Sequence, residues 1–377
     1  MRNRNDSKKR HLFCVIMAGG QGTRFWPLSR AHHPKQLLKI LSPKTLIRET
    51  ADRVLPLSGP KQTLVVTVAP QVRALTKELP MLKRENWIAE PEGKNTAPCL
   101  GLAALEVVRR DPEGIMVVLP ADHWVADVNA FRRTLASGVA IAARHNSLVT
   151  VGVRPDYPET GYGYILKSKK VEPASKLPLY RVKRFKEKPL LGEAKKLIRR
   201  GSLWNSGIFI WRAATLLELL HRYQPAIAEK ISRIRQAANR ASLAAAAPRL
   251  QRTIAREYRK MPNLSIDHAV LEKAGSEGKV HTLEANFGWS DIGSWAAVHR
   301  MLQRDPTGNA GNGRWLALGS QNCLVHAPDR LVVLFGLDNV VVVDTPDALL
   351  VGHLKRSQQV RELVEELKQK GYGSYTV

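Results

Sequence analysis

The sequence of 377 residues contains only three cysteines. Cys14, Cys99 and Cys323 are far apart, odd in number and form no C-x-x-C pair, so the sequence supports neither a disulfide framework nor a zinc cluster. This use of cysteine is typical of a reducing compartment, and we expect a cytoplasmic protein.

Long apolar segments are also missing. The most apolar run, residues 331–343, is short and is interrupted by Asp338 and Asn339, so no transmembrane helix is expected. The basic start leads directly into a predicted strand, without the apolar region and cleavage site of a secretory signal. We therefore expect no association with a membrane.

Acidic and aromatic residues are scarce relative to basic ones. There are 33 Asp and Glu against 59 Lys and Arg, which gives a formal net charge of +26. Such an excess attracts anions, including nucleic acid, anionic lipid and phosphorylated small molecules. The two most basic segments, 1–10 and 233–260, contain no aromatic residue except Tyr258, whereas nucleic-acid surfaces usually interleave the two types. The pattern favours solvated basic surfaces over a dedicated nucleic-acid site.

Between residues 11 and 303, short apolar runs alternate with amphipathic segments. Apolar runs without polar alternation are typical of strands buried in a parallel sheet. This alternation predicts a doubly wound α/β sheet, with ligands at the carboxyl ends of its strands. Buried strands are predicted at 12–17, 63–68, 115–119 and 148–153, with helices at 97–110 and 130–144. Further strands are predicted at 162–167, 180–186, 207–211 and 280–285, and helices at 189–200, 213–223 and 226–260.

The character of the sequence changes after residue 304. A turn-rich stretch at 305–309 is followed by short apolar runs at a spacing that indicates a small all-β domain. A closing helix is predicted at 357–370, with Ser357 as its cap. Strands are predicted at 323–327, 331–334, 339–344 and 348–352. We expect three parts: a basic flexible tail at 1–10, an α/β domain at 11–303, and a β-rich domain with a terminal helix at 304–377.

A glycine-rich loop directly follows the first predicted strand and contains Gly19, Gly20, Gly22 and Thr23. Glycines at the end of a first parallel strand let the backbone turn sharply and approach a phosphate closely. No Gly-Lys-Ser/Thr follows, which argues against a P-loop, and Phe25 stands where the dinucleotide fingerprint has its third glycine. The loop is therefore of a different phosphate-binding kind.

Three cations, Arg24, Arg30 and Lys35, follow this loop within one short segment. Fixed cations beside a glycine turn suit a polyphosphate better than a single phosphate. The combination predicts a loop that binds a nucleoside triphosphate.

The loop also carries a family resemblance. GGQGTRFWPLSR at 19–30 and PKQ at 34–36 resemble the signature of nucleotide-sugar pyrophosphorylases, in particular bacterial mannose-1-phosphate guanylyltransferases. Matching motifs continue in order along the chain: EPEGKNTAP at 90–98, PADH at 120–123, TGYGYI at 160–165, FKEKP at 185–189, WNSGIF at 204–209, SIDHAVLEK at 265–273 and WSDIGSW at 289–295. An ordered series of this length is far more specific than any single motif.

This resemblance implies a Rossmann-like doubly wound mixed sheet that forms the nucleotidyltransferase domain, followed by a small C-terminal β-helical domain. It also implies the reaction GTP plus α-D-mannose 1-phosphate to GDP-mannose and pyrophosphate, by in-line attack on the α-phosphate, with Mg²⁺ required. Three alternatives stay open: glucose 1-phosphate with UTP or dTTP as substrates, a nucleotide-sugar sensor without turnover, and nucleic-acid binding on the strength of the charge alone.

Charged residues acquire roles from the resemblance. Arg24 and Lys35 are implied to hold the leaving pyrophosphate, and Lys188 to bind the sugar phosphate, although Lys186 could trade places with Lys188. Asp122 and Asp291, each of which could instead cap a helix, are implied Mg²⁺ ligands because magnesium near phosphates is commonly held by one or two carboxylates.

Other residues are implied to select the substrates. Glu187, Gly161 and Asn205 match positions that contact the sugar. The base is implied to lie near a segment whose candidate residues are Glu90, Asn95 and Thr96, where Thr96 is also expected to cap the helix that starts at 97. Lys94 stands where arginine is usual, which puts a bidentate role there in doubt.

The C-terminal part shows no chemistry of its own. In the family the β-helical segment packs on the catalytic domain and often takes part in oligomer contacts, so a homodimer is the candidate assembly. The chain ends soon after this segment, without the isomerase domain of longer relatives, and a single activity is expected.

Overall fold

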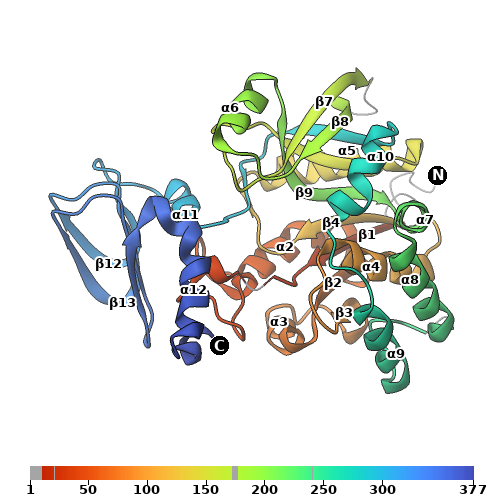
Figure 1. Ribbon diagram of the computed structural model, residues 1–377, viewed down its shortest axis with the longest axis horizontal. Helices are drawn as coiled ribbons and strands as arrows, with labels where there is room; N and C mark the ends of the chain where they lie inside the picture. Colours follow the sequence, from red (N-terminus) through yellow and green to blue (C-terminus); the bar gives the residue numbers. More distant parts are fainter. Residues whose placement is uncertain (1–10, 21, 172–176, 240) are drawn as a thin grey trace.

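The computed structural model describes residues 11–20, 22–171, 177–239 and 241–377, so the predicted basic tail at 1–10 lies outside the described residues. Its centre is a nine-stranded sheet with helices on both faces (Figure 1). In spatial order the strands are β3 (Trp87–Glu90), β2 (Thr63–Val68), β1 (Leu12–Met17), β4 (Ile115–Pro120), β9 (Leu203–Arg212), β6 (Leu148–Val153), β10 (Val280–Ala285), β8 (Leu179–Lys186) and β7 (Tyr164–Val171).

The sheet is mixed because β9 runs antiparallel to both of its neighbours, β4 and β6. Strands β1 to β4 pair in parallel, so their carboxyl ends meet at one edge. A ligand site is expected at such an edge, where the strand order reverses. The predicted doubly wound fold class is confirmed.

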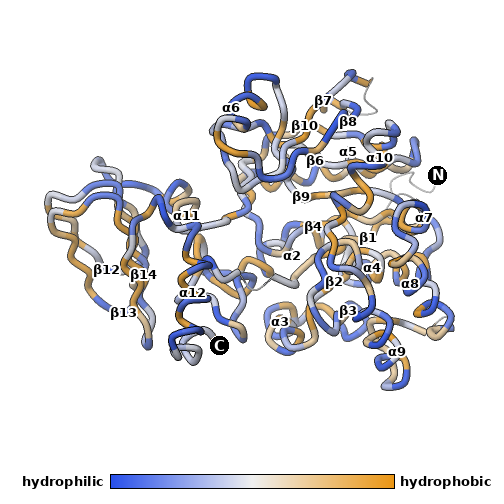
Figure 2. Tube along the Cα trace, in the orientation of Figure 1, coloured by the Kyte–Doolittle hydropathy of each residue, from blue (hydrophilic) through white to orange (hydrophobic). Residues whose placement is uncertain are grey.

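Both faces of the sheet are buried. On β1, Phe13 and Val15 belong to one apolar cluster, whereas Cys14 and Ile16 belong to another on the opposite face. Side chains alternate across a strand, and burial of both sets explains why the run reads as continuously apolar. Figure 2 shows this hydrophobic character concentrated on the central strands.

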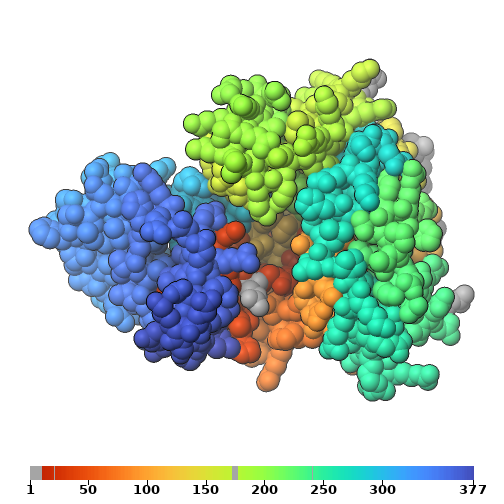
Figure 3. Space-filling model, viewed as in Figure 1, coloured from red at the N-terminus to blue at the C-terminus, as the bar shows by residue number. Residues whose placement is uncertain are grey.

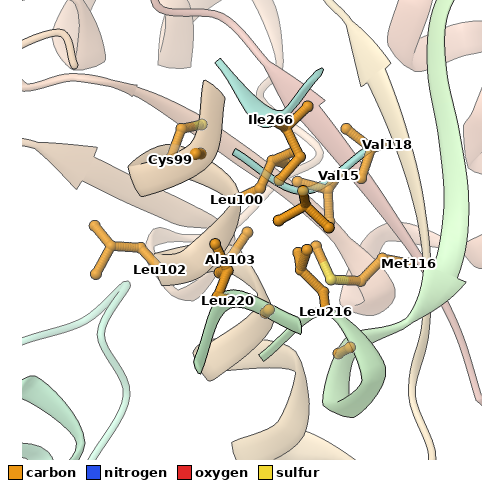
Figure 4. Packing of buried hydrophobic residues seen from close by; sticks show 14 of the residues in the cluster. Val15, Cys99, Leu100, Leu102, Ala103, Met116, Val118, Leu216, Leu220 and Ile266 are labelled. Atoms are coloured by element: carbon orange, nitrogen blue, oxygen red, sulfur yellow. The ribbon is translucent and has the colours of Figure 1, made fainter. Parts of the chain in front are cut away.

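Helices cover the two faces of the sheet. On one face, Leu100 and Ala103 of α4 pack with Leu216 and Leu220 of α7 over Val15 and its neighbours (Figure 4). The larger helices are α2 (Leu46–Ser58), α3 (Val72–Glu78), α4 (Thr96–Arg110), α5 (Val128–His145), α6 (Leu191–Arg199), α7 (Ala213–Tyr223), α8 (Pro225–Ala238), α9 (Pro248–Arg259) and α11 (Trp295–Met301). No helix among the described residues is long and apolar enough to cross a membrane.

A four-stranded sheet forms the C-terminal part, with β12 (Ala310–Leu318), β13 (Leu324–Phe335) and β14 (Val340–Asp344) in parallel and β15 (Leu349–His353) antiparallel to β14. The closing helix α12 (Val360–Gln369) lies between this sheet and the large domain (Figure 1). One apolar cluster joins the two parts, because Phe25 and Trp26 of the glycine loop pack with Trp295, Val360 and Val364.

The structure corrects three details. The helix predicted at 226–260 is two helices, since Asn239 ends α8 in the left-handed region and α9 restarts at Pro248. The strands predicted at 323–327 and 331–334 form one strand, β13. The prediction that Ser357 caps the closing helix is wrong: its hydroxyl instead accepts a hydrogen bond from the Ala296 amide at 3.1 Å.

Candidate active site

A pocket of about 470 Å³ lies beyond the carboxyl ends of β1 and β4. Figure 3 shows this face of the molecule hollowed where red residues of the first loop meet blue residues of the C-terminal part. The pocket is lined by Gly22, Thr23, Arg24, Phe25, Lys35, Asp122, His123, Asp291, Gly293, Arg361 and Glu365. Four of the predicted charged residues, Arg24, Lys35, Asp122 and Asp291, are thus brought to one place.

The glycine loop is shaped by its contact with Lys35. Gly22 has a φ of 68°, and a Cβ atom there would lie 2.2 Å from the Cβ of Lys35. The Gln36 side chain donates to the Gly20 carbonyl at 2.9 Å, and the Ser29 hydroxyl donates to the Gly22 carbonyl at 2.7 Å. Only glycine fits at position 22, and the segment after the loop holds it in shape.

Lys35 connects the loop with both predicted metal ligands. Its ammonium lies 2.9 Å from the Asp122 carboxylate and donates to the Asp291 carbonyl at 2.6 Å. Only 8% of its side chain is exposed. Three segments far apart in the sequence therefore converge on one buried cation.

The two carboxyl groups of the pocket differ in their environment. Burial would raise the pKa of Asp122, but the opposing effects, of which that of the Lys35 ammonium is the largest, together hold the pKa below its ordinary value. Burial raises the pKa of Asp291, against the lowering effect of Lys35, and the nearby Asp122 raises it further. The Tyr162 hydroxyl donates to Asp291 at 2.7 Å and positions that carboxyl group.

These residues suit a magnesium ion that also binds phosphate. Within the described ranges, no group of three or more His, Cys, Asp or Glu is arranged to hold a metal. Asp122 and Asp291 nevertheless face one pocket, and two carboxylates completed by substrate oxygens and water are a usual Mg²⁺ environment. His123 is buried as a neutral ring with its pKa lowered to about 4, and its Nδ1 accepts from the Trp289 indole at 3.1 Å, which fits a structural role.

Two of the three predicted sugar-contacting residues, Glu187 and Asn205, lie together where β7 begins, β8 ends and β9 begins. A Cβ atom at Gly163 would lie 2.7 Å from the Glu187 carboxylate and 3.4 Å from the Asn205 Cβ, so these three residues are adjacent. The Asn205 amide donates to Asp267 at 2.8 Å, and burial together with Glu187 raises the pKa of Asp267 to about 6. The third predicted residue, Gly161, has other neighbours: its amide donates to Glu159 at 2.8 Å, and a Cβ atom there would lie 3.7 Å from the Gln358 side chain.

Lys188 and Lys186, the two candidate cations for the sugar phosphate, form ion pairs with different residues. Lys188 has a φ of 39°, and its ammonium pairs with Glu187 at 2.9 Å. Lys186 pairs instead with Glu193 of α6 at 3.2 Å. Lys188 is thus paired with Glu187 of the predicted sugar site, whereas Lys186 is paired with α6.

Glu90 lies beside the glycine loop and is 3% exposed. A Cβ atom at Gly19 would lie 3.3 Å from one Glu90 oxygen, and the other oxygen accepts a hydrogen bond from the Tyr258 hydroxyl. Burial raises the pKa of Glu90 to about 7, although the Tyr258 hydrogen bond lowers it. This carboxyl group is therefore poised between its two protonation states near neutral pH.

One neighbouring prediction comes out differently. Asn95, with a φ of 65°, caps α4 by accepting from the Thr96 amide at 2.9 Å, so the prediction that Thr96 is the cap is wrong. The Thr96 hydroxyl instead accepts from the Ile266 amide at 2.7 Å. Lys94 donates to the Met261 carbonyl at 2.9 Å and ties this segment to the end of α9.

Comparison with known proteins decides the family. A family model described as nucleotidyl transferase matches residues 13–307, and one described as the MannoseP isomerase/GMP-like β-helix domain matches residues 313–367. The chain is 35% identical to the mannose-1-phosphate guanylyltransferase of Escherichia coli strain K12, over 97% of this chain and 75% of that protein. The chain belongs to the mannose-1-phosphate guanylyltransferase family.

Two further relatives support membership of this family. The Klebsiella pneumoniae mannose-1-phosphate guanylyltransferase is 36% identical, over 97% of this chain and 75% of that protein. A crystal structure from Thermus thermophilus, described as a mannose-1-phosphate geranyltransferase, superposes with a TM-score of 0.83 at 34% identity, over 95% of this chain and 99% of that one. The chain is a nucleotidyltransferase with the α/β domain and β-helix domain of its family, as its motifs indicated.

Sequence reasoning missed several residues of the site. Tyr162 and Asp267 lie inside family motifs, but nothing in their spacing singled them out. Tyr258, Arg361 and Glu365 lie in segments without a motif, and only the folded chain brings them to the site.

Arg30 also departs from expectation, since it does not line the pocket with Arg24 and Lys35. Its guanidinium donates to the Tyr375 carbonyl and pairs with Asp347 at 2.9 Å. It therefore holds the C-terminal part against the glycine loop.

Replacing Gly22 with alanine tests the shape of this loop. The Gly22→Ala protein is expected to lose stability by more than the roughly 1–2 kcal/mol of a left-handed residue, because its Cβ also overlaps Lys35. Gly201→Ala is the matched control, since Gly201 ends α6 with a φ of 69° and the hydrogen bonds of a left-handed helix end, but has open space around its Cβ. Equal losses in urea unfolding of the two variants would show that the contact with Lys35 is unimportant.

The buried Glu90 carboxyl predicts a pH dependence of stability. Because its pKa rises from 4.5 to about 7 on folding, its contribution is fully present below pH 4.5 and is lost as pH rises through about 7. The free energy of unfolding of the natural chain, relative to Glu90→Gln, is expected to fall over that window by on the order of 3 kcal/mol. Denaturant unfolding of both proteins at several pH values measures this, and a difference independent of pH would refute it.

Proposed function

We propose that this protein transfers a guanylyl group from GTP to α-D-mannose 1-phosphate and releases pyrophosphate. The main support is the convergence of Arg24, Lys35, Asp122 and Asp291 on one pocket at the sheet edge. A sugar nucleotidyltransferase related to mannose-1-phosphate guanylyltransferases needs such a place for a polyphosphate. The four charged groups also favour turnover over a sensor that merely binds.

The chemistry needs no general base from the protein. A phosphate monoester has its second pKa near about 6, so the sugar phosphate is already an anion at neutral pH. One of its oxygens attacks the α-phosphorus in line, a new O–P bond forms, and the bond to the bridging oxygen breaks. The pyrophosphate departs with that electron pair. Catalysis then consists of positioning and charge neutralisation.

Different residues of the pocket provide the positioning and the charge neutralisation. Arg24 and Lys35 neutralise the pyrophosphate as negative charge builds on it, and Lys35 is already fixed by its contacts with Asp122 and Asp291. Asp122 and Asp291 would hold Mg²⁺, which when bound supplies charge neutralisation and orientation of phosphate oxygens. Lys188 draws in the sugar phosphate against the repulsion between two anionic substrates.

The remaining candidates select the substrates. Glu187, Asn205 and Gly161 are assigned to the sugar, with Asp267 fixing the Asn205 amide by the 2.8 Å hydrogen bond. Glu90 or a nearby backbone carbonyl supplies the acceptor for the N1 and N2 hydrogens of guanine, next to the loop that carries Gly19. Asn95 and Thr96 shape this side of the nucleotide site, since their polar groups are engaged within the protein.

A pyrophosphate-release screen tests the proposed reaction. Four nucleoside triphosphates are crossed with mannose, glucose and other sugar 1-phosphates, with and without Mg²⁺. The expected result is fastest release with GTP and mannose 1-phosphate and little release without the metal. Fastest release with UTP or dTTP and glucose 1-phosphate would show that these, and not GTP and mannose 1-phosphate, are the substrates. No release in any combination would overturn the proposal that the protein is an enzyme.

Separate replacement of Lys188 and Lys186 tests the assignment of the sugar-phosphate cation. Lys188→Ala is expected to raise KM for mannose 1-phosphate by about tenfold to a hundredfold, the range expected when one charge-assisted hydrogen bond is lost. KM for GTP should change far less. Lys186→Ala, which loses the same charge next to Glu193, is the control. The assignment is wrong if Lys186→Ala shows the larger effect.

A further inference from the structure

Two side chains that line the triphosphate pocket come from the C-terminal part of the chain. Arg361 and Glu365 lie four residues apart on α12, so they share one face of that helix. Every other lining residue belongs to the nucleotidyltransferase domain. The C-terminal helix thus closes one side of the pocket.

Packing fixes α12 in this position. Val360 and Val364 are buried in the same apolar cluster as Phe25 and Trp26 of the glycine loop. Residues 360 and 364 share one face of the helix, and residues 361 and 365 share the adjacent face. Burial of the two valines therefore fixes the rotation of α12 at which Arg361 and Glu365 line the pocket. The pocket-facing side of α12 is therefore determined by the core and not by a flexible tail.

Hydrogen bonds fasten the end of the chain to the same loop. The Trp26 indole donates to the Tyr375 carbonyl at 2.8 Å, and the Ala31 amide donates to the Thr376 carbonyl at 3.2 Å. Arg30 adds the ion pair with Asp347. The loop that binds phosphate and the helix that carries Arg361 are built as one unit.

The charges in the pocket leave Arg361 available to a ligand. Lys35 is engaged with Asp122 and Asp291, whereas the Arg361 guanidinium makes no hydrogen bond or ion pair with any residue that the structure describes. Glu365 does not neutralise it, since that carboxylate pairs with Lys368 at 3.0 Å. Arg361 therefore adds a guanidinium fork to a pocket in which Arg24 also has no partner within the described chain.

We propose that Arg361 is a binding residue for the pyrophosphate end of the nucleotide, which makes the C-terminal domain part of the nucleotide site. The proposal rests on the proposed function, because it places the triphosphate in this pocket. The helix that carries Arg361 packs on Phe25 and Trp26, next to Arg24, so we assign Arg361 together with Arg24 to the phosphates that leave and not to the one that is attacked. A planar guanidinium binds two phosphate oxygens at once, which suits it to this role.

Calorimetric titration of the full-length protein with inorganic pyrophosphate and with GTP, in the presence of Mg²⁺, tests the proposal without requiring turnover. Arg361→Ala is expected to weaken the binding of pyrophosphate and of GTP by about tenfold to a hundredfold. Arg361→Lys is expected to weaken it by less, because lysine keeps the positive charge but cannot bind two phosphate oxygens at once. Lys370→Ala is the matched control: it removes one charge from the end of α12, where Lys370 pairs with Glu366 outside the pocket. Thermal unfolding of each variant checks that α12 stays packed.

Kinetics supply a second readout. Arg361→Ala should raise KM for GTP in the forward reaction and for pyrophosphate in the reverse reaction, while KM for mannose 1-phosphate stays unchanged. Unaltered binding of both ligands by Arg361→Ala overturns the inference, and so does an equal loss in Lys370→Ala, which would reflect general charge alone. Failure of the proposed function has a different signature, since the unsubstituted protein would then release no pyrophosphate whatever the binding data show.

Discussion

The ammonium group of Lys35 is the point on which the site depends. It lies between the Asp122 carboxylate and the Asp291 carbonyl, and the Cβ of the same residue occupies the space that a side chain at position 22 would need. The loop after β1, the end of β4 and the segment before α11 are held together by this one cation. A buried cation without these acceptors would be costly, so the three segments and Lys35 stabilise one another.

The same segment joins the two domains. Phe25 and Trp26 follow the glycine loop directly and pack into the cluster that includes Trp295 and α12. The loop that is proposed to hold the triphosphate is therefore packed directly against the C-terminal helix. This gives the C-terminal domain, which carries no family motif for catalysis, a physical route to the reaction: it supplies one side of the pocket and orients Arg361.

Sequence patterns predicted what depends on local chemistry and burial. The strands Leu12–Met17, Thr63–Val68 and Leu148–Val153 were found at the predicted residues, because burial on both faces leaves a nearly continuous apolar run. Thr96 and Ser357 were both predicted as caps on residue preference, yet each hydroxyl serves a distant backbone amide, of Ile266 and of Ala296. Preference for a cap cannot reveal a competing partner that only the fold brings near.

The charged residues show the same limit. Arg24, Lys35 and Arg30 looked equivalent beside the glycine loop, but Arg30 faces Asp347 because the C-terminal part folds back onto that side. Arg361 could not be found at all, since nothing in its neighbourhood of the sequence indicates phosphate binding. The positions of Arg30 and Arg361 are set by packing between segments far apart in the sequence, and local motifs carry no information on such packing.

The central claim is that the pocket around Lys35 is the reacting centre, with Asp291 as one of its metal-binding carboxylates. The rate of pyrophosphate release by Asp291→Asn, compared with Asp127→Asn, tests it most directly. Asp127 only caps α5 by accepting from the Ala130 amide at 2.8 Å, and asparagine caps a helix equally well. The account predicts a folded Asp291→Asn protein with kcat reduced on the order of 10²–10³-fold and an unaffected control. A kcat for Asp291→Asn close to that of the unsubstituted protein would contradict it.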